Sequence, residues 1–252
     1  MNRNLETIRA AIQEYQNTLE TNKTIWNNIR KRTIRIRVQQ YLFKVTHNTP
    51  MVGDVWFQIP EYEDQGTCSA CGGTESMEHI IVGCTQGTAN IIWRLARESW
   101  NHDTYKWPRI CLGIALGCGS LTAIPHHADA NPGNPHRLPT ERKGATRLLQ
   151  ILISEATHLI WVLRCERVIQ EKTHTPHETE AQWLKVINRR LTEDKLVATR
   201  IKRTKHHTRL IEATWEDLLK KNPNLPENWI QDCEVLVGRR AQRVMPIDDH
   251  AP

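Results

Sequence analysis

The sequence predicts a mainly α protein, with a small helical domain followed by a helical C-terminal region. Apolar residues recur at spacings of three and four along most of the chain, which is the period of amphipathic helices. Strands and helices do not alternate, no repeat of fixed period is visible, and no heptad pattern is sustained. With 39% hydrophobic residues, the 252-residue chain can build a core and can hold one or two domains.

The N-terminal part predicts two helices. Leu5, Ile8 and Ile12 belong to an apolar stripe that predicts a helix over residues 4–20. A second helix is expected over about residues 24–45. Residues 34–38 alternate apolar and basic side chains, so a strand is an alternative for that short piece.

Four residues then form a compact array of metal-ligand types. Cys68, Cys71, His79 and Cys84 follow the pattern C-x2-C-x7-H-x4-C, which has the ligand types and tight spacing of a closed tetrahedral zinc site. Three thiolates and one neutral imidazole around Zn²⁺ carry a charge of −1. Four protein ligands leave no position open for water, so the ion is expected to be structural. The alternative is a chance grouping among seven cysteines and twelve histidines.

The residues between the ligands suggest how the array closes. Gly72 follows Cys71 directly, where a sharp bend with positive φ is expected. Thr74 or Ser76 can cap a short helix over residues 78–82. Since His79 and Cys84 are five residues apart, Gly83 is expected to end that helix and let Cys84 turn back.

Further helices are expected over about residues 87–101, 145–172, 178–204 and 208–220, with one more helical turn within residues 229–237. Turn-forming residues dominate 120–145 and predict a loop. The predicted organisation is therefore a lead-in and zinc-binding domain over residues 1–102 (zinc module about 47–102), a loop or linker over 103–145, a helical C-terminal region over 146–237, and a flexible tail over 238–252.

The sequence also indicates in which cellular compartment the protein is expected. The N-terminus lacks the apolar run of a secretory signal, and the apolar stretch over residues 148–163 falls short of the ~20 residues of a membrane span. Together with a thiolate zinc site, these features favour a reducing intracellular compartment, the nucleus ahead of the cytoplasm, and no membrane partner. No pattern for a small-molecule substrate is visible.

Positive charge gathers in two stretches of a chain whose net charge is +6. Residues 21–44 contain seven Lys or Arg and no acid; residues 185–209 contain nine against Glu193 and Asp194. Solvated helix faces are the alternative explanation, but two such stretches beside a zinc module favour RNA or DNA as partner. The candidate nucleic-acid-binding residues are Arg30, Lys31, Arg32, Arg35, Arg37, Arg189, Arg190, Arg200, Lys202, Arg203 and Lys205.

Catalytic motifs are missing. The aspartates are scattered, without the converging carboxylates that Mg²⁺-dependent phosphoryl transfer requires. The chain contains neither a phosphate-binding G-x-x-x-x-G-K-[ST] loop nor a G-x-S-x-G nucleophile elbow. We therefore expect no catalytic activity.

The residues resemble a known family. The matching features are Trp26, RIRVQQYLFKVTH at 35–47, CSAC at 68–71, ESMEHII at 75–81, Cys84 and Trp93. They look like the reverse-transcriptase zinc-binding domain near the C-terminus of non-LTR (LINE-type) retrotransposon polyproteins. The segment LIWVLRCER at 159–167 resembles the region that follows it in fungal copies. The resemblance implies a zinc-stabilised, nucleic-acid-associated module with these same four ligands.

No residues match the polymerase or nuclease domains of such polyproteins, so we expect a remnant or a domesticated copy without their activity. The leading hypothesis is a non-catalytic zinc-binding module that binds RNA or DNA, with a polymerase acting in trans as a further candidate partner. The alternative is a structural or protein-interaction module in which zinc only stabilises the fold.

Overall fold

The protein is mainly α, as the sequence predicts. The computed structural model describes residues 2–100, 102–126, 139–200, 205–220 and 225–238. No strand occurs within these residues, only two isolated bridges. The elements are α1 (Asn2–Gln16), α2 (Asn22–Ile29), α3 (Ile36–Thr46), η1 (Gly53–Gln58), η2 (Glu63–Gly66), η3 (His79–Gly83), α4 (Ala89–Ser99), α5 (Leu112–Leu116), η4 (Cys118–Ser120), α6 (Thr140–Gln170), α7 (Pro176–Arg200) and α8 (Lys205–Leu219).

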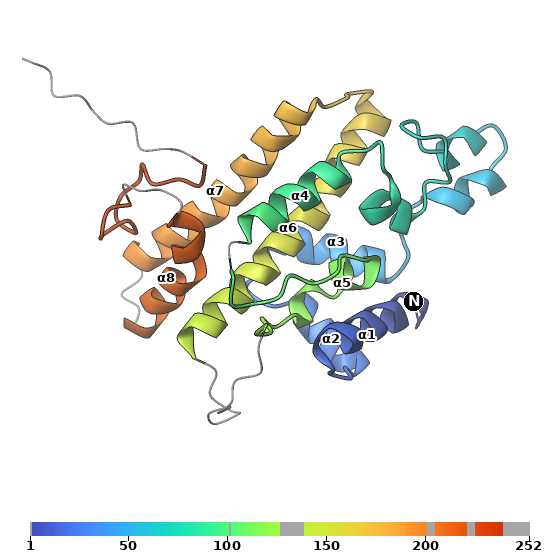
Figure 1. Ribbon diagram of the computed structural model, residues 1–252. Coiled ribbons are helices and arrows are strands. Elements are labelled where there is room, and N and C mark those ends of the chain that lie inside the picture. Colours follow the sequence, from blue (N-terminus) through green and yellow to red (C-terminus); the bar gives the residue numbers. More distant parts are fainter. Residues whose placement is uncertain (1, 101, 127–138, 201–204, 221–224, 239–252) are drawn as a thin grey trace, which may run out of the picture.

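Helix α6 is the centre of the fold. It packs against α3, α4, α5, α7 and α8, and Figure 1 shows it running through the middle of the molecule. We expected its apolar stretch to be too short for a membrane span, but among the described residues this is the one helix whose length and composition would allow it to cross a membrane. Within its most apolar window, 78% is buried inside the protein. Its apolar side chains thus serve the core, where Leu148, Leu152 and Ile153 are fully buried.

The second predicted helix is divided in two. Helix α2 ends at Ile29 and α3 begins at Ile36. In between, Ile34 is buried and Arg35 has extended backbone, so that its side chain reaches Glu155 of α6. Tertiary contacts thus override a helical pattern that contains no Gly or Pro. Residues 36–38 belong to α3, which rules out the strand alternative.

The segment 103–145, predicted to be a linker, contributes to the core. All residues of α5 and η4 are buried. Gly113 makes this possible, because a Cβ at that position would lie 2.3 Å from the carbonyl oxygen of Thr7 in α1. The buried apolar residues form one cluster from Leu5 to Val237, which continues through the predicted boundary. Residues 127–138, in the predicted loop, lie outside the described part of the chain.

The other helices are confirmed with small changes at their ends, except the last one. The helices expected over residues 4–20, 87–101, 145–172, 178–204 and 208–220 correspond to α1, α4, α6, α7 and α8. Residues 229–237 form turns and no helix. Trp229, Val235 and Val237 are nevertheless buried, so this segment packs on the core without helical structure. The predicted tail lies outside the described residues from 239 onward.

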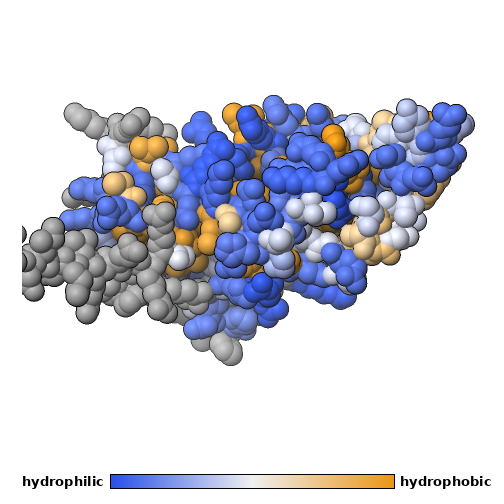
Figure 2. All heavy atoms as spheres, turned by 90° about the horizontal axis from the view of Figure 1, so that it is seen from above, coloured by the Kyte–Doolittle hydropathy of each residue, from blue (hydrophilic) through white to orange (hydrophobic). Residues whose placement is uncertain are grey.

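One part of the molecule projects from the helices. The segment with η1 and η2 forms a lobe at the edge of the ribbon, drawn in light blue to cyan in Figure 1, and the two short helices pack on each other. The Trp56 indole N–H donates to the Met51 carbonyl oxygen, and Trp56 lies beside Tyr62. Elsewhere, Figure 2 shows a face covered mostly by hydrophilic residues, with apolar residues in small separate patches.

Candidate metal centre

The first two ligands of the array are held by one tight loop. The backbone N–H of Cys68 donates to the carbonyl of Gly73 (2.8 Å), and the N–H of Gly72 donates to the carbonyl of Cys68 (2.8 Å). Gly72 has φ +76°, as its position after Cys71 predicts. A Cβ there would meet no atom within 4 Å, so glycine is favoured by the backbone conformation and not by lack of space.

The other two ligands lie on a π-helical turn. Ser76 caps it, since its Oγ accepts a hydrogen bond from the backbone N–H of His79 (3.1 Å). The backbone N–H of Cys84 donates to the carbonyl of His79 (2.8 Å), which closes a five-residue turn. The helix ends at Gly83 and Cys84 has extended backbone, as predicted, but the turn is of the π type. The wider π turn itself brings the two ligands together, and such turns are frequent at functional sites.

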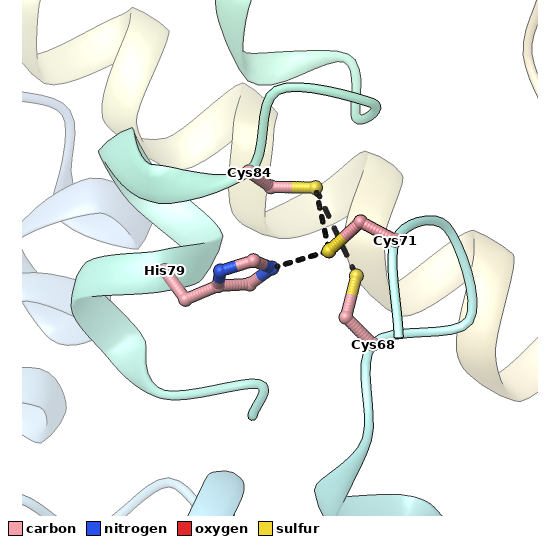
Figure 3. A group of neighbouring side chains, drawn as sticks. All are labelled: Cys68, Cys71, His79 and Cys84. Carbon is pink, nitrogen blue, oxygen red and sulfur yellow. Dashed lines mark hydrogen bonds between the residues drawn. The ribbon is translucent and has the colours of Figure 1, made fainter. Parts of the chain in front are cut away.

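The four side chains converge on one point (Figure 3). Their ligand atoms all lie within 4.8 Å of one another. The Cys71 Sγ lies 3.3 Å from the His79 Nε2, and the Cys84 Sγ lies 3.8 Å from the Cys68 Sγ and 3.9 Å from the Cys71 Sγ. Cys68 and Cys84 are buried and Cys71 is exposed, so the group opens to solvent on one side. These four residues could hold a metal ion.

The thiols of this group differ in acidity. Burial raises the pKa of Cys68, but hydrogen bonds from His79 and from the N–H groups of Ala70 and Cys71 outweigh it and lower the pKa to about 7. Burial raises the pKa of Cys84 to about 11, and the nearby Cys68 acts in the same direction. Without a cation the three thiols therefore cannot all be ionised near neutral pH. A bound cation would favour the three thiolates and release protons.

A buried ion pair joins this group to α6. Glu75 is only 1% exposed, and its carboxylate accepts hydrogen bonds from Arg167 (2.8 Å) and from the Arg164 Nε (3.0 Å). The Arg167 guanidinium also lies 3.7 Å from the Cys68 Sγ. A guanidinium beside the thiolates offsets the negative charge of a three-thiolate site.

The sequence did not reveal this pair. Arg164 and Arg167 resemble the polar side of an amphipathic helix, yet Arg164 is buried. Because Glu75 lies 89 residues from Arg164 in the sequence, no local pattern connects them.

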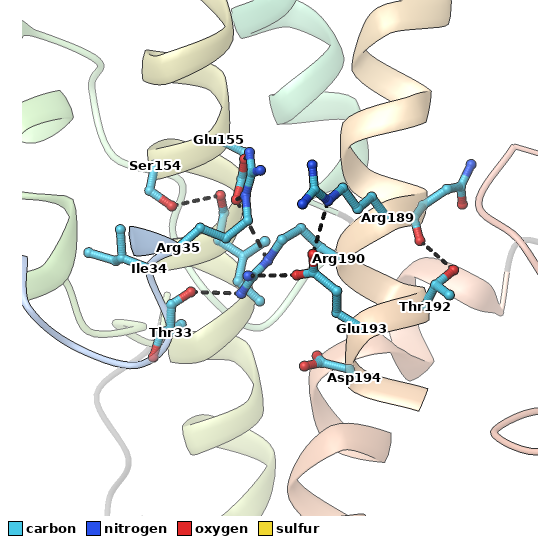
Figure 4. Close-up of polar contacts among 12 residues, drawn as sticks. Thr33, Ile34, Arg35, Ser154, Glu155, Arg189, Arg190, Thr192, Glu193 and Asp194 are labelled. Carbon is cyan, nitrogen blue, oxygen red and sulfur yellow. Dashed lines mark hydrogen bonds and ion pairs between the residues drawn. The ribbon is translucent and has the colours of Figure 1, made fainter. Parts of the chain in front are cut away.

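Three of the predicted nucleic-acid-binding residues make contacts within the fold. Arg35 donates to both carboxylate oxygens of Glu155, which raises the Arg35 pKa, and Arg190 lies 3.6 Å from the same carboxylate. Figure 4 shows both arginines at Glu155. The Lys31 Nζ donates to the Gly119 carbonyl (2.7 Å), and burial lowers its pKa. In the structure these three side chains support the fold, and their contact with phosphates stays a prediction.

The remaining candidates divide by exposure. Arg30, Arg32, Arg37 and Arg189 are exposed. Arg189 pairs with Glu193 (3.0 Å) one helical turn away, a solvent-exposed contact that contributes at most about 1 kcal/mol. The description does not extend to the following candidates: Lys202, Arg203 and the side chains of Arg200 and Lys205.

Within the described residues, no second cluster of His, Cys, Asp or Glu has metal-binding geometry, and Cys111, Cys118, Cys165 and Cys233 are free thiols. The comparisons with known proteins place the chain in no family: no family model, no curated protein and no solved structure matches it.

Proposed function

We propose that the protein is a non-catalytic module in which Cys68, Cys71, His79 and Cys84 hold a structural zinc ion, and that it binds RNA or DNA through a basic surface. The observation that carries the nucleic-acid part is the convergence of the two basic stretches. Arg190 of α7 donates to the Thr33 carbonyl (2.7 Å), although the two residues are 157 positions apart. The contact places the α2–α3 turn directly against α7.

In this arrangement some arginines stabilise the fold and others are exposed and accessible to phosphates. Arg35 and Arg190 meet at the buried carboxylate of Glu155 and fix the turn to α6 and α7 (Figure 4). The exposed arginines near this contact are Arg32 and Arg37 in the α2–α3 region and Arg189 on α7. Because residues 21–53 contain no acid, phosphates near the α2–α3 side of this surface would meet little repulsion, whereas the α7 side also carries Glu193, the partner of Arg189.

The zinc assignment is supported by the ligand geometry. Tetrahedral zinc with Zn–S bonds of about 2.3 Å requires sulfur atoms about 3.8 Å apart. The measured separations from the Cys84 Sγ are 3.8 and 3.9 Å. Four protein ligands complete the coordination of zinc, so the ion would stabilise the fold without activating water.

The resemblance to the reverse-transcriptase zinc-binding domain agrees with this proposal. It favours origin from the C-terminal part of a retrotransposon polyprotein, with a polymerase in trans as a possible second partner and the nucleus as the expected compartment. No polymerase or nuclease activity follows from the resemblance, since the residues that would carry it are missing from this sequence.

The zinc part is tested by metal analysis of the purified protein. We expect one zinc ion per chain in the wild type and less than a tenth of that in Cys71→Ser. The matched control is Cys233→Ser, because Cys233 is an exposed free thiol outside the cluster. A wild-type protein that retains no zinc under metal-replete conditions would contradict the assignment.

The nucleic-acid part is tested by charge reversal. The triple variant Arg30→Glu, Arg32→Glu, Arg37→Glu should weaken binding to RNA or DNA more than tenfold, and each lost phosphate contact should lower the salt-dependence slope by about 1. Arg35 is left unchanged because it stabilises the fold. The matched control reverses the exposed Arg94, Arg97 and Arg109, which gives the same change in net charge.

Fluorescence anisotropy over a salt titration measures both variants. Equal losses in the two triple variants would mean that net charge alone attracts nucleic acid. Absence of binding by the zinc-loaded wild type at low salt would end the proposal.

A second candidate function is a protein-interaction module, and the projecting lobe favours it. Phe57 and Tyr62 are exposed there, and so are the neighbouring Asp54, Glu63 and Asp64. Exposed apolar groups with acidic neighbours fit a basic protein segment better than they fit phosphates. Reversal of Arg30, Arg32 and Arg37 would leave such an interaction intact.

A further inference from the structure

An aromatic group lies on the surface of α2 and α3. The Trp26 ring stacks on the His47 ring, with centroids 4.8 Å apart and an angle of 23° between the planes. The Phe43 ring lies 4.3 Å from His47 and 5.4 Å from Trp26. Trp26 is partly buried and packs against the core, whereas Phe43 is 42% exposed. One edge of the group is thus anchored while Phe43 faces solvent.

Basic residues occupy positions close to these rings along the two helices. Lys23 of α2 lies three residues before Trp26, and Arg30, the residue that follows α2, lies four residues after it, so the helical spacing places both on the side of Trp26. On α3, Lys44 neighbours Phe43 and lies three residues before His47. All three cations are exposed.

Rings of this kind between cations can contact two parts of a nucleotide at once. An unpaired base can stack on an exposed aromatic ring while its phosphates meet lysine and arginine. Bases inside a duplex are stacked on each other and offer no free face, so this arrangement favours a single strand over a duplex.

We infer that Trp26, Phe43 and His47 form a stacking platform for the bases of single-stranded nucleic acid, with Lys23, Arg30 and Lys44 contacting its phosphates. The inference rests on the proposed nucleic-acid function and specifies its ligand. The platform lies on the same two helices that lead into and out of the basic turn at residues 30–35. The platform joins the middle of α2, at Trp26, to the C-terminal end of α3, at Phe43 and His47. A strand that contacts both the turn and the platform therefore runs along this pair of helices.

The test compares two phenylalanines of equal exposure. Phe43 belongs to the platform and Phe57 belongs to the projecting lobe; they are 42% and 44% exposed. Phe43→Ala should weaken binding of short oligo(dT) and oligo(U) about tenfold, as expected for the loss of one base-stacking contact. Its affinity for a duplex of the same length should change less than twofold. Phe57→Ala should leave the binding of all three probes unchanged.

Two further variants distinguish base stacking from a general apolar contact, and a folding check excludes misfolding as the cause of weak binding. Phe43→Leu retains apolar area without a π face and should bind almost as weakly as Phe43→Ala. Trp26→Phe retains a ring and should keep most of the affinity. Full-length, zinc-loaded protein is used throughout, and circular dichroism checks that each variant is folded. Comparison of oligo(dT) with oligo(U) distinguishes DNA from RNA.

The outcomes separate this inference from the function on which it rests. If Phe43→Ala binds oligo(dT) and oligo(U) like the wild type while the arginine reversal abolishes binding, the platform is wrong and the proposed function stands. Equal weakening on single strand and duplex would also overturn the platform. If the wild type binds none of the three probes at low salt, both proposals fail.

Discussion

The α2–α3 region (residues 21–44) and the region of the candidate metal centre (residues 45–93) are neighbours in the sequence and opposite in charge. Residues 21–44 contain seven Lys or Arg and no acid, while residues 45–93 contain no Lys or Arg and six Asp or Glu. Each region nevertheless exposes a phenylalanine to a similar extent, Phe43 and Phe57. Exposed aromatic area alone therefore does not identify a partner. The charge around it favours nucleic acid at the first region and disfavours it at the second.

Both regions are fixed to α6 by buried carboxylate–arginine contacts with opposite polarity. In the basic region, Arg35 comes from the turn and Glu155 from α6. In the acidic region, Glu75 comes from the metal-binding segment, and Arg164 and Arg167 come from α6. The central helix thus presents a carboxylate to the basic region and guanidinium groups to the acidic one. This match makes α6 the element that determines how the two regions are positioned.

Loss of one residue of the proposed zinc site should give the largest difference in stability between the two regions. Cys84→Ser removes a buried thiol of the proposed zinc site. Because metal-binding free energy is folding free energy in such sites, we expect several kcal/mol of local stability to be lost. Hydrogen exchange should show loss of protection over residues 66–84, while α6 and α7 keep theirs. Cys233→Ser should behave like the wild type. Equal loss of protection in all helices would show that the metal supports the whole core.

Removal of one buried carboxylate should have the next largest effect. Glu75→Gln leaves Arg164 and Arg167 without their counter-charge, and such losses typically cost about 3–5 kcal/mol. Glu155→Gln should cost a similar amount, but with exposure of the α2–α3 turn and not of the metal-binding segment. Denaturant unfolding gives the free energies and hydrogen exchange gives the location. Glu78→Gln, at an exposed position, is the control; a cost below 1 kcal/mol for Glu75→Gln would contradict the role of the pair.

The same comparison shows what the sequence could reveal. The clustering of Cys68, Cys71, His79 and Cys84 was predictable because the array spans only residues 68–84, so local spacing encodes it. The helices were predictable because their apolar stripes repeat locally. The roles of Arg35 and Arg190 were not predictable, since Glu155 lies 120 residues from Arg35. A basic run in a sequence does not distinguish an arginine that pairs internally from one that faces solvent.

Two further differences have local causes that only the packed structure exposes. The turn at His79 is a π turn, and it brings the side chains of His79 and Cys84 to the same point. The short apolar run at α5 lies within the predicted linker, and its place in the core becomes visible only when Gly113 is seen against the backbone of α1. The acidic character of residues 45–93, in contrast, was visible in the sequence, in the absence of any Lys or Arg over that stretch.

A smaller effect should appear with pH at the contact between α3 and α6. His158 packs edge-on against Tyr41, and burial, together with Arg35 and Arg37, lowers its pKa to about 4. The unfolded chain binds a proton near the ordinary pKa of about 6.5, while the folded chain does not. Stability should therefore fall as pH decreases from about 6.5 to 4, and not change through this group above that window. The difference in urea midpoint between the wild type and His158→Gln, measured against pH, isolates the contribution of His158 to stability. A difference that does not change with pH would contradict this prediction.

Neutralising the projecting lobe should have the smallest effect. Glu61→Gln, Glu63→Gln and Asp64→Asn remove three exposed charges without touching the buried Glu75. At physiological salt, charges farther than about 8 Å apart are screened from each other. If nucleic acid binds at the α2–α3 region, the affinity for oligo(dT) should therefore change less than twofold at this salt concentration. At low salt the change should grow, because screening weakens. A tenfold gain in affinity at physiological salt would mean that the acidic lobe lies close to the bound strand. The acidic side chains of the lobe would then weaken nucleic-acid binding directly by repelling its phosphates.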